Sequence, residues 1–241
     1  MKYLIDIFRF SLLVLIFTSC HENQNVQLFD GHSFSGWEGS MDAFRIQDGS
    51  IIGGSLEKGL DESYYLCTTK EYSDFELSLS VKLIHKELKG NAGVSFGATR
   101  VNGSNRVASY QADIGYITPD IVVRCSDYTP ADMISQFSLW GTLIDECRDD
   151  LSRYPDPEFY PAVILEMPER ELIQNIVKPY EWNDINILVK GQEIQIKVNG
   201  ITTVKFTENQ NISTNGTICL QAHQGDPYEV HYKDIVIKKI N

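Results

Sequence analysis

The stretch "DFELSLSVKLI" (74–84) alternates apolar and polar side chains along most of its length. Phe75, Leu77, Leu79, Val81 and Leu83 occupy every second position. Because successive side chains of a strand point to opposite faces, this period predicts a strand with one face on a core and the other toward solvent.

Similar strand patterns recur along the chain. The segment "FRIQDGSIIGG" (44–54) predicts a hairpin that turns at Asp48-Gly49. Further strands are predicted in 185–206, in "TICLQAH" (217–223) and in "YEVHYKDIVIKKI" (228–240). Many short strands joined by Gly-containing turns indicate an all-β fold, either a sandwich or a jelly roll.

One convincing helix is predicted, over "PERELIQNIVKP" (168–179), with Pro168 in its first turn. Its apolar stripe consists of Leu172, Ile173, Ile176 and Val177. Long segments rich in Pro, Asp and Tyr flank it at 116–134 and 149–167. We expect these segments to be loops, since connections of that length in a compact domain are usually functional or disordered.

The first residues, "MKYLIDIFRFSLLVLIFTS" (1–19), have a basic start, an apolar run and then small residues before Cys20. This order predicts a lipoprotein signal peptide, and the apolar run is too short to span a bilayer. Resemblance to bacterial lipoproteins implies a lipidated Cys20 that anchors the protein to the cell envelope without a transmembrane helix. We expect a tether over 20–26 and a single domain over 27–241. The side of the membrane that the domain faces stays open.

Charge and cysteine content exclude some classes of partner. The chain has a formal net charge of −12, which argues against binding to nucleic acid, because phosphate backbones require a basic face. Cys67, Cys125, Cys147 and Cys219 show no zinc-site spacing. Cys67 and Cys219 lie in apolar strand-like runs, and we expect buried thiols there rather than a disulfide.

Three predicted strands each have one polar face. In "NAGVSFGA" (91–98), Asn91 shares a face with two glycines and a serine, which leaves room for a ligand against the backbone. In "SYQADIG" (109–115), Gln111 and Asp113 oppose the apolar residues, and in 217–223 Gln221 and His223 do the same. Alternation in "WGTLIDECR" (140–148) groups Trp140, Thr142, Glu146 and Arg148. An aromatic plane, amides and ionisable groups together suit a sugar site.

Several motifs occur in the order seen in one bacterial family. They include "LFDGHSFSGW" (28–37), "GNAGVSF" (90–96), "SYQADIG", "WGTLIDECR", "EWNDINILVKG" (181–191) and "GTICLQAHQG" (216–225). From about Gln27 to Asn241 the chain resembles the 3-keto-disaccharide hydrolase family. The resemblance implies a concanavalin-like jelly-roll sandwich. It also implies a hydrolase or lyase that acts on glycosides whose glucose unit is oxidised at carbon 3.

The chain departs from the family pattern at several positions. Ala92 and Ile144 stand where the family usually has Ser and Tyr, and Asp149 stands where a second Arg often follows Arg148. An insertion also lies between Gly115 and Trp140. These departures affect the predicted substrate more than the predicted class of reaction.

A ketone at carbon 3 acidifies the proton on carbon 2, so such a glycoside can be cleaved by elimination. The enzyme then needs a base, a group that stabilises the enolate oxygen, and an acid for the leaving oxygen. Our hypothesis assigns His223 or Asp113 as base, Glu146 as acid, and Arg148 or a divalent cation as enolate stabiliser, with base and acid interchangeable. Asn91, Gln111, Trp140 and Gln221 would hold the sugar ring.

Other interpretations of these residues stay open. Asp113 and Glu146 could serve a two-carboxylate glycosidase on unoxidised sugars. The chain could also be a non-catalytic glycan-binding lipoprotein, because fold alone does not determine function. Asp113 could be a turn acceptor, and Glu146 could simply pair with Arg148. A metal held by Asp113, Glu146 and His223 is conceivable, although no compact ligand spacing requires it.

Overall fold

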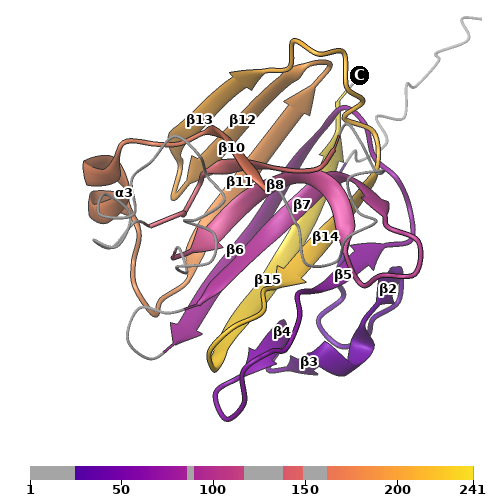
Figure 1. The fold of residues 1–241 in the computed structure, drawn as a ribbon, viewed down its shortest axis with the longest axis vertical. Helices are drawn as coiled ribbons and strands as arrows, with labels where there is room; N and C mark the ends of the chain where they lie inside the picture. The colour runs from indigo at the N-terminus through magenta and orange to yellow at the C-terminus, as the bar shows by residue number, and fades with distance from the viewer. Residues whose placement is uncertain (1–24, 86–89, 117–137, 149–161, 241) are drawn as a thin grey trace, which may run out of the picture.

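The computed structural model describes residues 25–85, 90–116, 138–148 and 162–240. Two antiparallel sheets pack on each other across an apolar core, so the predicted all-β sandwich is confirmed (Figure 1). Within the described residues, no helix is long and apolar enough to cross a membrane. The predicted signal peptide and Cys20 lie outside the described residues.

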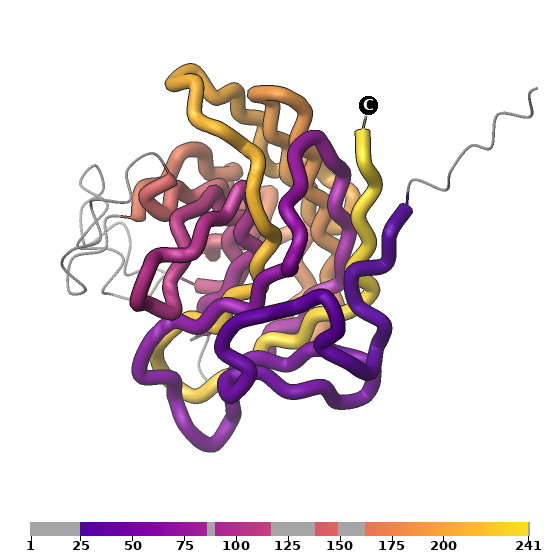
Figure 2. Tube along the Cα trace, turned by 90° about the vertical axis from the view of Figure 1, so that its right-hand side faces the viewer, coloured from indigo at the N-terminus to yellow at the C-terminus, as the bar shows by residue number. Residues whose placement is uncertain are grey.

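Eight strands form the first sheet. Its order is β13 (Ile201–Thr207), β12 (Glu193–Val198), β11 (Asn183–Lys190), β6 (Phe75–His85), β15 (Tyr228–Lys239), β4 (Ser50–Ser55) and β3 (Phe44–Gln47), with β1 (Asn25–Gln27) paired to β15. Burial in β6 alternates at every residue, as its sequence predicts. The described chain starts and ends side by side in this sheet, because β1 runs along the last strand (Figure 2).

The second sheet has seven strands. Its order is β10 (Val163–Glu166), β9 (Leu143–Glu146), β8 (Val107–Gly115), β7 (Asn91–Arg100), β14 (Thr217–Ala222), β5 (Tyr64–Thr68) and β2 (Trp37–Gly39). The three strands with predicted polar faces, β8, β7 and β14, are consecutive in this order. Strands far apart in sequence thus present one continuous surface.

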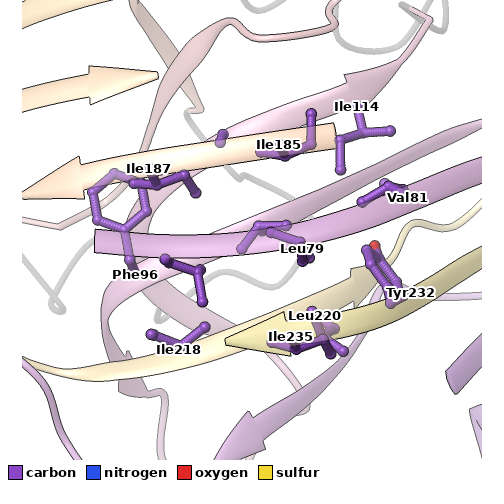
Figure 3. Packing of buried hydrophobic residues seen from close by; sticks show 14 of the residues in the cluster. Leu79, Val81, Phe96, Ile114, Ile185, Ile187, Ile218, Leu220, Tyr232 and Ile235 are labelled. Atoms are coloured by element: carbon purple, nitrogen blue, oxygen red, sulfur yellow. The ribbon is translucent and has the colours of Figure 1, made fainter. Parts of the chain in front are cut away.

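The core lies between the two sheets (Figure 3). From the first sheet come Leu79, Val81, Ile185, Ile187, Tyr232 and Ile235, and from the second come Phe96, Ile114, Ile218 and Leu220. The apolar sides of β7, β8 and β14 are therefore turned inward. Their polar sides must lie on the opposite face of the second sheet, because side chains alternate along a strand.

The β3–β4 hairpin turns at Asp48-Gly49, as predicted. Both residues have positive φ, 50° for Asp48 and 71° for Gly49. A two-residue hairpin turn with both central residues in this region matches the right-handed twist of the strands, which explains the Asp-Gly pair.

The predicted helix is present but shorter. Helix α3 covers Arg170–Ile176, and Ile173 is its fully buried residue. The chain leaves helical geometry at Val177. At this end, the Asn199 side chain donates a hydrogen bond to the carbonyl of Ile176 at 2.7 Å, which satisfies a carbonyl that the helix leaves without an internal partner.

Three sequence-based expectations about the fold need correction. The segment 149–167, which we expected to be a loop, contains strand β10 (Val163–Glu166), which pairs with β9. Asn25 and Val26, which we assigned to the tether, belong to β1, where Val26 pairs with Ile237. Cys67 and Cys219 form a disulfide, whereas the sequence favoured buried thiols. The two cysteines are directly opposed in the β5–β14 pair, with Cα atoms 3.9 Å apart. They are separated by 152 residues in sequence, so strand pairing alone brings them together.

A short 3-10 helix, η1 (Met41–Ala43), follows β2 and leads into β3. It carries the chain from the edge of the second sheet to the edge of the first. The two sheets are thereby joined at this side by a connection of only a few residues.

Candidate active site

The polar face of the second sheet is built by strand register. Gly93 of β7 lies opposite Asp113 of β8 on one side and opposite Gln221 of β14 on the other. Gln221 in turn lies opposite Tyr65 of β5. Directly opposed residues share a face of the sheet. The row Asp113, Gly93, Gln221 and Tyr65 therefore runs across four strands on the side away from the core.

A chain of hydrogen bonds crosses this face. Ser95 Oγ donates to Gln111 Oε1 at 2.9 Å, and Gln111 Nε2 donates to Gln221 Oε1 at 3.3 Å. Gln221 Nε2 donates to Tyr65 Oη at 2.7 Å. The Gln111 side chain lies over Gly93, where a Cβ atom would come within 2.4 Å of Gln111 Cδ. Gly93 thus leaves the space that allows the two amides to meet.

A pocket with a volume of about 60 Å³ opens on this face. It is lined by Ser63, Tyr65, Asn91, Arg106, Gln111, Asp113, Ile144, Glu146, Ala162, Gln221, His223 and Gln224. The amides and carboxyl groups of its floor are buried, and Arg106 and His223 at its edge are half-buried. Six predicted site residues, Asn91, Gln111, Asp113, Glu146, Gln221 and His223, come together here.

Asp113 has a strongly perturbed carboxyl group. Its side chain is 2% exposed, and burial raises the pKa of its carboxyl well above the ordinary value. The nearby charge of Glu146 raises this pKa further, while hydrogen bonds from the Ile114 amide, at 2.7 Å, and from Asn91 act in the opposite direction. A carboxyl group held protonated in this way can supply a proton at a pH where an ordinary aspartate cannot.

Glu146 reaches the same pocket from β9. It lies opposite Ser109 in the β8–β9 pair, and its side chain is 5% exposed. Both carboxyl groups line the pocket, and the charge of Glu146 raises the pKa of Asp113. A like charge nearby disfavours ionisation of a buried carboxyl group, which favours the protonated form of Asp113.

His223 stands just beyond the end of β14. Its Nδ1 lies 2.7 Å from the carbonyl oxygen of Gln224. Because a carbonyl oxygen only accepts hydrogen bonds, Nδ1 carries the hydrogen, and in the neutral ring Nε2 is the basic nitrogen. Tyr228 Oη donates to the carbonyl of His223 at 2.9 Å, which holds the backbone that carries the ring.

Arg148 is not part of this pocket. It donates to Asp145 and, at 2.6 Å, to Glu208, which follows β13 of the other sheet, and its guanidinium stacks over Tyr110. The expected alternation fails because Cys147 has a φ of 56°. This conformation turns Arg148 onto the core side with Asp145. Arg148 thus pairs with Asp145 and Glu208 and not with Glu146.

Trp140 is also absent from the pocket. It lies in the core with only 2% of its surface exposed. Trp140 and Gly141 form a turn, and Gly141 has a φ of 73°. Strand alternation therefore does not apply before β9, and Trp140 cannot serve as the platform for a sugar ring.

Six of the twelve pocket residues were not predicted from the sequence, among them Tyr65, Ser63 and Arg106. Tyr65 and Ser63 come from β5 and the residues before it, and Arg106 precedes β8. The alternation of "YYLCT" (64–68) could have put Tyr65 on the same face as Cys67, but only the pairing of β5 with β14 brings it to Gln221. Arg106 lies in a connection, where no periodic signal exists.

The described side chains of the pocket do not form a metal centre. Within the described residues, no group of three or more His, Cys, Asp or Glu side chains is arranged to hold a metal ion. One oxygen of Asp113 is already bound to the Ile114 amide. We therefore derive no chemical step through a divalent cation.

Comparison with known proteins agrees with this architecture. A structure described as a "putative glycosyl hydrolase" from Parabacteroides distasonis is similar, with a TM-score of 0.59, 20% identity, and coverage of 90% of this chain and 94% of that one. The carbohydrate-binding module CBM66 from Bacillus subtilis has a TM-score of 0.54, 9% identity, and coverage of 85% and 96%. At these levels of sequence identity, the similarity shows a shared fold only. No curated protein matches the chain at significant similarity.

The family assignment rests on the sequence pattern. The pattern of the 3-keto-alpha-glucoside-1,2-lyase-like domain matches residues 24–238, nearly the whole chain. This match confirms the family resemblance inferred from the motifs. The chain therefore belongs to the family of 3-keto-α-glucoside-1,2-lyase-like domains.

Proposed function

We propose that this protein cleaves 3-keto-glucosides or 3-keto-disaccharides by elimination followed by hydration, with the pocket on the second sheet as its active site. The observation that carries the proposal is the buried Asp113, with a raised carboxyl pKa, in one pocket with Glu146 and His223. Membership of the family supports the substrate class. Such a pocket holds a candidate acid and a candidate base together.

The reaction starts at carbon 2 of the oxidised ring. His223 Nε2 takes the carbon 2 proton, and the electron pair moves to the carbon 3 oxygen to form an enolate. The enolate re-forms the ketone and expels the glycosidic oxygen from carbon 1, and protonated Asp113 gives its proton to that oxygen. The products are the free alcohol and a sugar with a double bond between carbons 1 and 2.

Hydration completes the cleavage. Water adds its hydroxyl to carbon 1, and carbon 2 regains a proton, so the net reaction consumes one water for each glycosidic bond. Asp113, now ionised, can take the proton from the attacking water, and protonated His223 can return a proton to carbon 2. Both groups regain their initial states.

The remaining pocket residues bind and orient the ring. Arg106 replaces Arg148 as the cation for the enolate oxygen, since Arg106 lines the pocket. Gln111 and Gln221 are held by the hydrogen-bond chain from Ser95 to Tyr65. Side chains held in this way can form hydrogen bonds with sugar hydroxyls and lose little conformational entropy on binding. Glu146 favours the protonated form of Asp113.

The test is incubation of the purified protein with 3-keto-trehalose in deuterated water. We expect release of reducing sugar, and deuterium at carbon 2 of the product. Asp113→Asn and His223→Gln should each lower kcat by at least about a hundredfold, the usual contribution of a positioned acid or base. Asp48→Asn, in the exposed β3–β4 turn, is the control and should keep full activity.

Two outcomes would replace the proposal by a rival. Cleavage of an unoxidised glycoside with the carbon 2 hydrogen retained would indicate a two-carboxylate glycosidase that uses Asp113 and Glu146. Sugar binding without turnover of any 3-keto-glucoside would indicate a glycan-binding protein, a role that other proteins of similar fold have.

We also propose that the domain is held in the bacterial cell envelope by lipid on Cys20. The support is the sequence of residues 1–20, with its basic start, apolar run and small residues before the cysteine. Metabolic labelling with palmitate should mark the wild-type protein, and Cys20→Ser should abolish the label and release the protein from the membrane fraction.

A further inference from the structure

A second recess lies between the ends of β4 and β5. It holds about 450 Å³, which is within the range of roughly 300 to 1,000 Å³ that is typical of ligand clefts. We call it the β4–β5 groove. Its polar lining includes Asp42, Ser55, Lys58, Asp61, Tyr64 and Asn105.

The β4–β5 groove is separate from the candidate active site. Tyr64 lines the groove, whereas its neighbour Tyr65 lines the active-site pocket. Likewise, Asn105 lines the groove, whereas its neighbour Arg106 lines the active-site pocket. Because successive side chains of a strand point to opposite faces, β5 forms a wall between the two recesses. None of the chemistry proposed above uses the groove.

Hydrogen bonds hold the polar groups of the groove in place. Tyr64 Oη donates to Asp61 Oδ1 at 2.9 Å, and this bond lowers the pKa of Asp61, so its carboxylate remains an acceptor. Asn105 Oδ1 accepts from Ser40 Oγ at 3.1 Å, and Asn105 Nδ2 donates to Glu62 at 3.0 Å.

The wall of the groove is also fixed by its backbone. Leu60 N donates to the Gly225 carbonyl at 3.1 Å, and Gly225 N donates to the Leu60 carbonyl at 2.9 Å. A Cβ atom on Gly59 would lie 2.1 Å from the Gly225 oxygen, so the two segments approach closely. A groove with a preformed wall binds a ligand at a lower ordering cost.

The chemistry of the lining narrows the class of ligand. Two carboxylates, Asp42 and Asp61, and one amine, Lys58, line the groove. This balance and the net charge of −12 of the chain disfavour an anion. The described residues hold no metal-binding group of side chains. Sugar hydroxyls can donate to the carboxylates and accept from Lys58, and the apolar face of a sugar ring can pack on Tyr64.

We propose that the β4–β5 groove is a second carbohydrate-binding site that holds a neutral sugar unit without cleaving it. The proposal stands independently of the reaction proposed for the pocket. A glycan bound in the groove is retained beside the active site, and this retention raises the effective concentration of its other units there.

The test is a titration of the full domain with maltose and with α,α-trehalose, both unoxidised, followed by the NMR shifts of backbone amides. We expect the amides of Gly54 and Gly59 to shift. Asp61→Asn and Tyr64→Phe should each weaken binding at least about fivefold, because Asp61→Asn replaces a charged acceptor oxygen by a neutral amide and Tyr64→Phe removes a hydroxyl from the groove. Asp48→Asn, an exposed aspartate elsewhere, and Asp113→Asn, in the pocket, should leave the affinity unchanged.

The proposal is overturned if neither sugar binds at millimolar concentration. It is also overturned if Asp113→Asn removes binding while Asp61→Asn does not, because the sugar would then occupy the pocket. If Asp61→Asn fails to fold, Tyr64→Phe and the shift map of the wild-type protein still decide. A protein that binds sugar in the groove but does not cleave 3-keto-trehalose would refute only the proposed function.

Discussion

The side chain of Gln111 donates a hydrogen bond to Gln221 at 3.3 Å by lying across the backbone of Gly93. The two glutamines belong to β8 and β14, which are separated by β7. The floor of the pocket is thus formed by side chains from two strands that are not adjacent in the sheet. This bridge depends on the missing side chain at Gly93, because a Cβ there would overlap Gln111.

Gly93→Ala should displace Gln111 and break the bridge to Gln221. We expect kcat/KM for a 3-keto-glucoside to fall about tenfold or more, which corresponds to roughly 1.4 kcal/mol. The loss of stability should be smaller, because the clash is with a side chain that can move. In a double-mutant cycle, Gly93→Ala should have little further effect on activity when Gln111 is already Ala. Additive losses in activity would contradict this account.

Asp113 should make folding stability fall as pH rises. Its folded-state pKa is raised, so its carboxyl binds more protons in the folded than in the unfolded state. This contribution is fully present below the unfolded pKa and is lost as pH rises toward the folded pKa. Relative to wild type, Asp113→Asn should gain stability with rising pH over that window. Urea unfolding at several pH values measures this difference, and parallel curves for the two proteins would refute it.

The Cys67–Cys219 disulfide should be a major source of stability. It joins strands whose cysteines are 152 residues apart in sequence. Removal of a native disulfide from a small secreted domain costs about 2 to 5 kcal/mol. The double variant Cys67→Ala/Cys219→Ala should therefore unfold at lower urea concentration. Reductant should lower the midpoint of the wild type and leave that of the variant unchanged. If wild type and the double variant unfold at the same urea concentration without reductant, the disulfide does not contribute this stability.

Arg148 should contribute mainly to stability, and Arg106 should contribute mainly to catalysis. Arg148→Gln leaves Asp145 and Glu208 without their buried cation, which should destabilise the fold by about 3 to 5 kcal/mol. Arg106→Gln should instead lower kcat with a much smaller change in stability, because Arg106 lies at the half-buried edge of the pocket. Thermal unfolding and steady-state kinetics on both variants separate the two effects. A loss of activity in Arg148→Gln at temperatures where it is fully folded would count against this division.

Glu208 should contribute stability that is lost in acid. Burial raises its pKa, but hydrogen bonds from Arg148, Gln210 and Tyr110 outweigh that effect and lower the pKa overall. A depressed folded-state pKa gives stability above the unfolded pKa, and this stability disappears as pH falls through the folded value. Wild type should therefore lose its advantage over Glu208→Gln as pH falls. An advantage that does not change with pH would refute this role.

Local patterns were sufficient for the longer strands and for part of the pocket lining. The alternation in β6 follows from the period of a strand, and the polar faces of β7, β8 and β14 follow from the same rule. Asn91, Gln111, Asp113, Gln221 and His223 could be found in this way, because each lies in a regular strand or just beyond one. The rule failed at Trp140 and Arg148, where Gly141 and Cys147 with positive φ interrupt the alternation.

The sequence by itself determined an all-β chain, the polar faces of β7, β8 and β14, and the family to which the chain belongs. Only the tertiary structure decided which strands are neighbours, and hence the Cys67–Cys219 disulfide, the Gln111–Gln221 bridge, and the place of Tyr65 and Arg106 in the pocket. The physical reason is that alternation is a local property of the backbone. Strand pairing depends instead on how two sheets bury their apolar faces together.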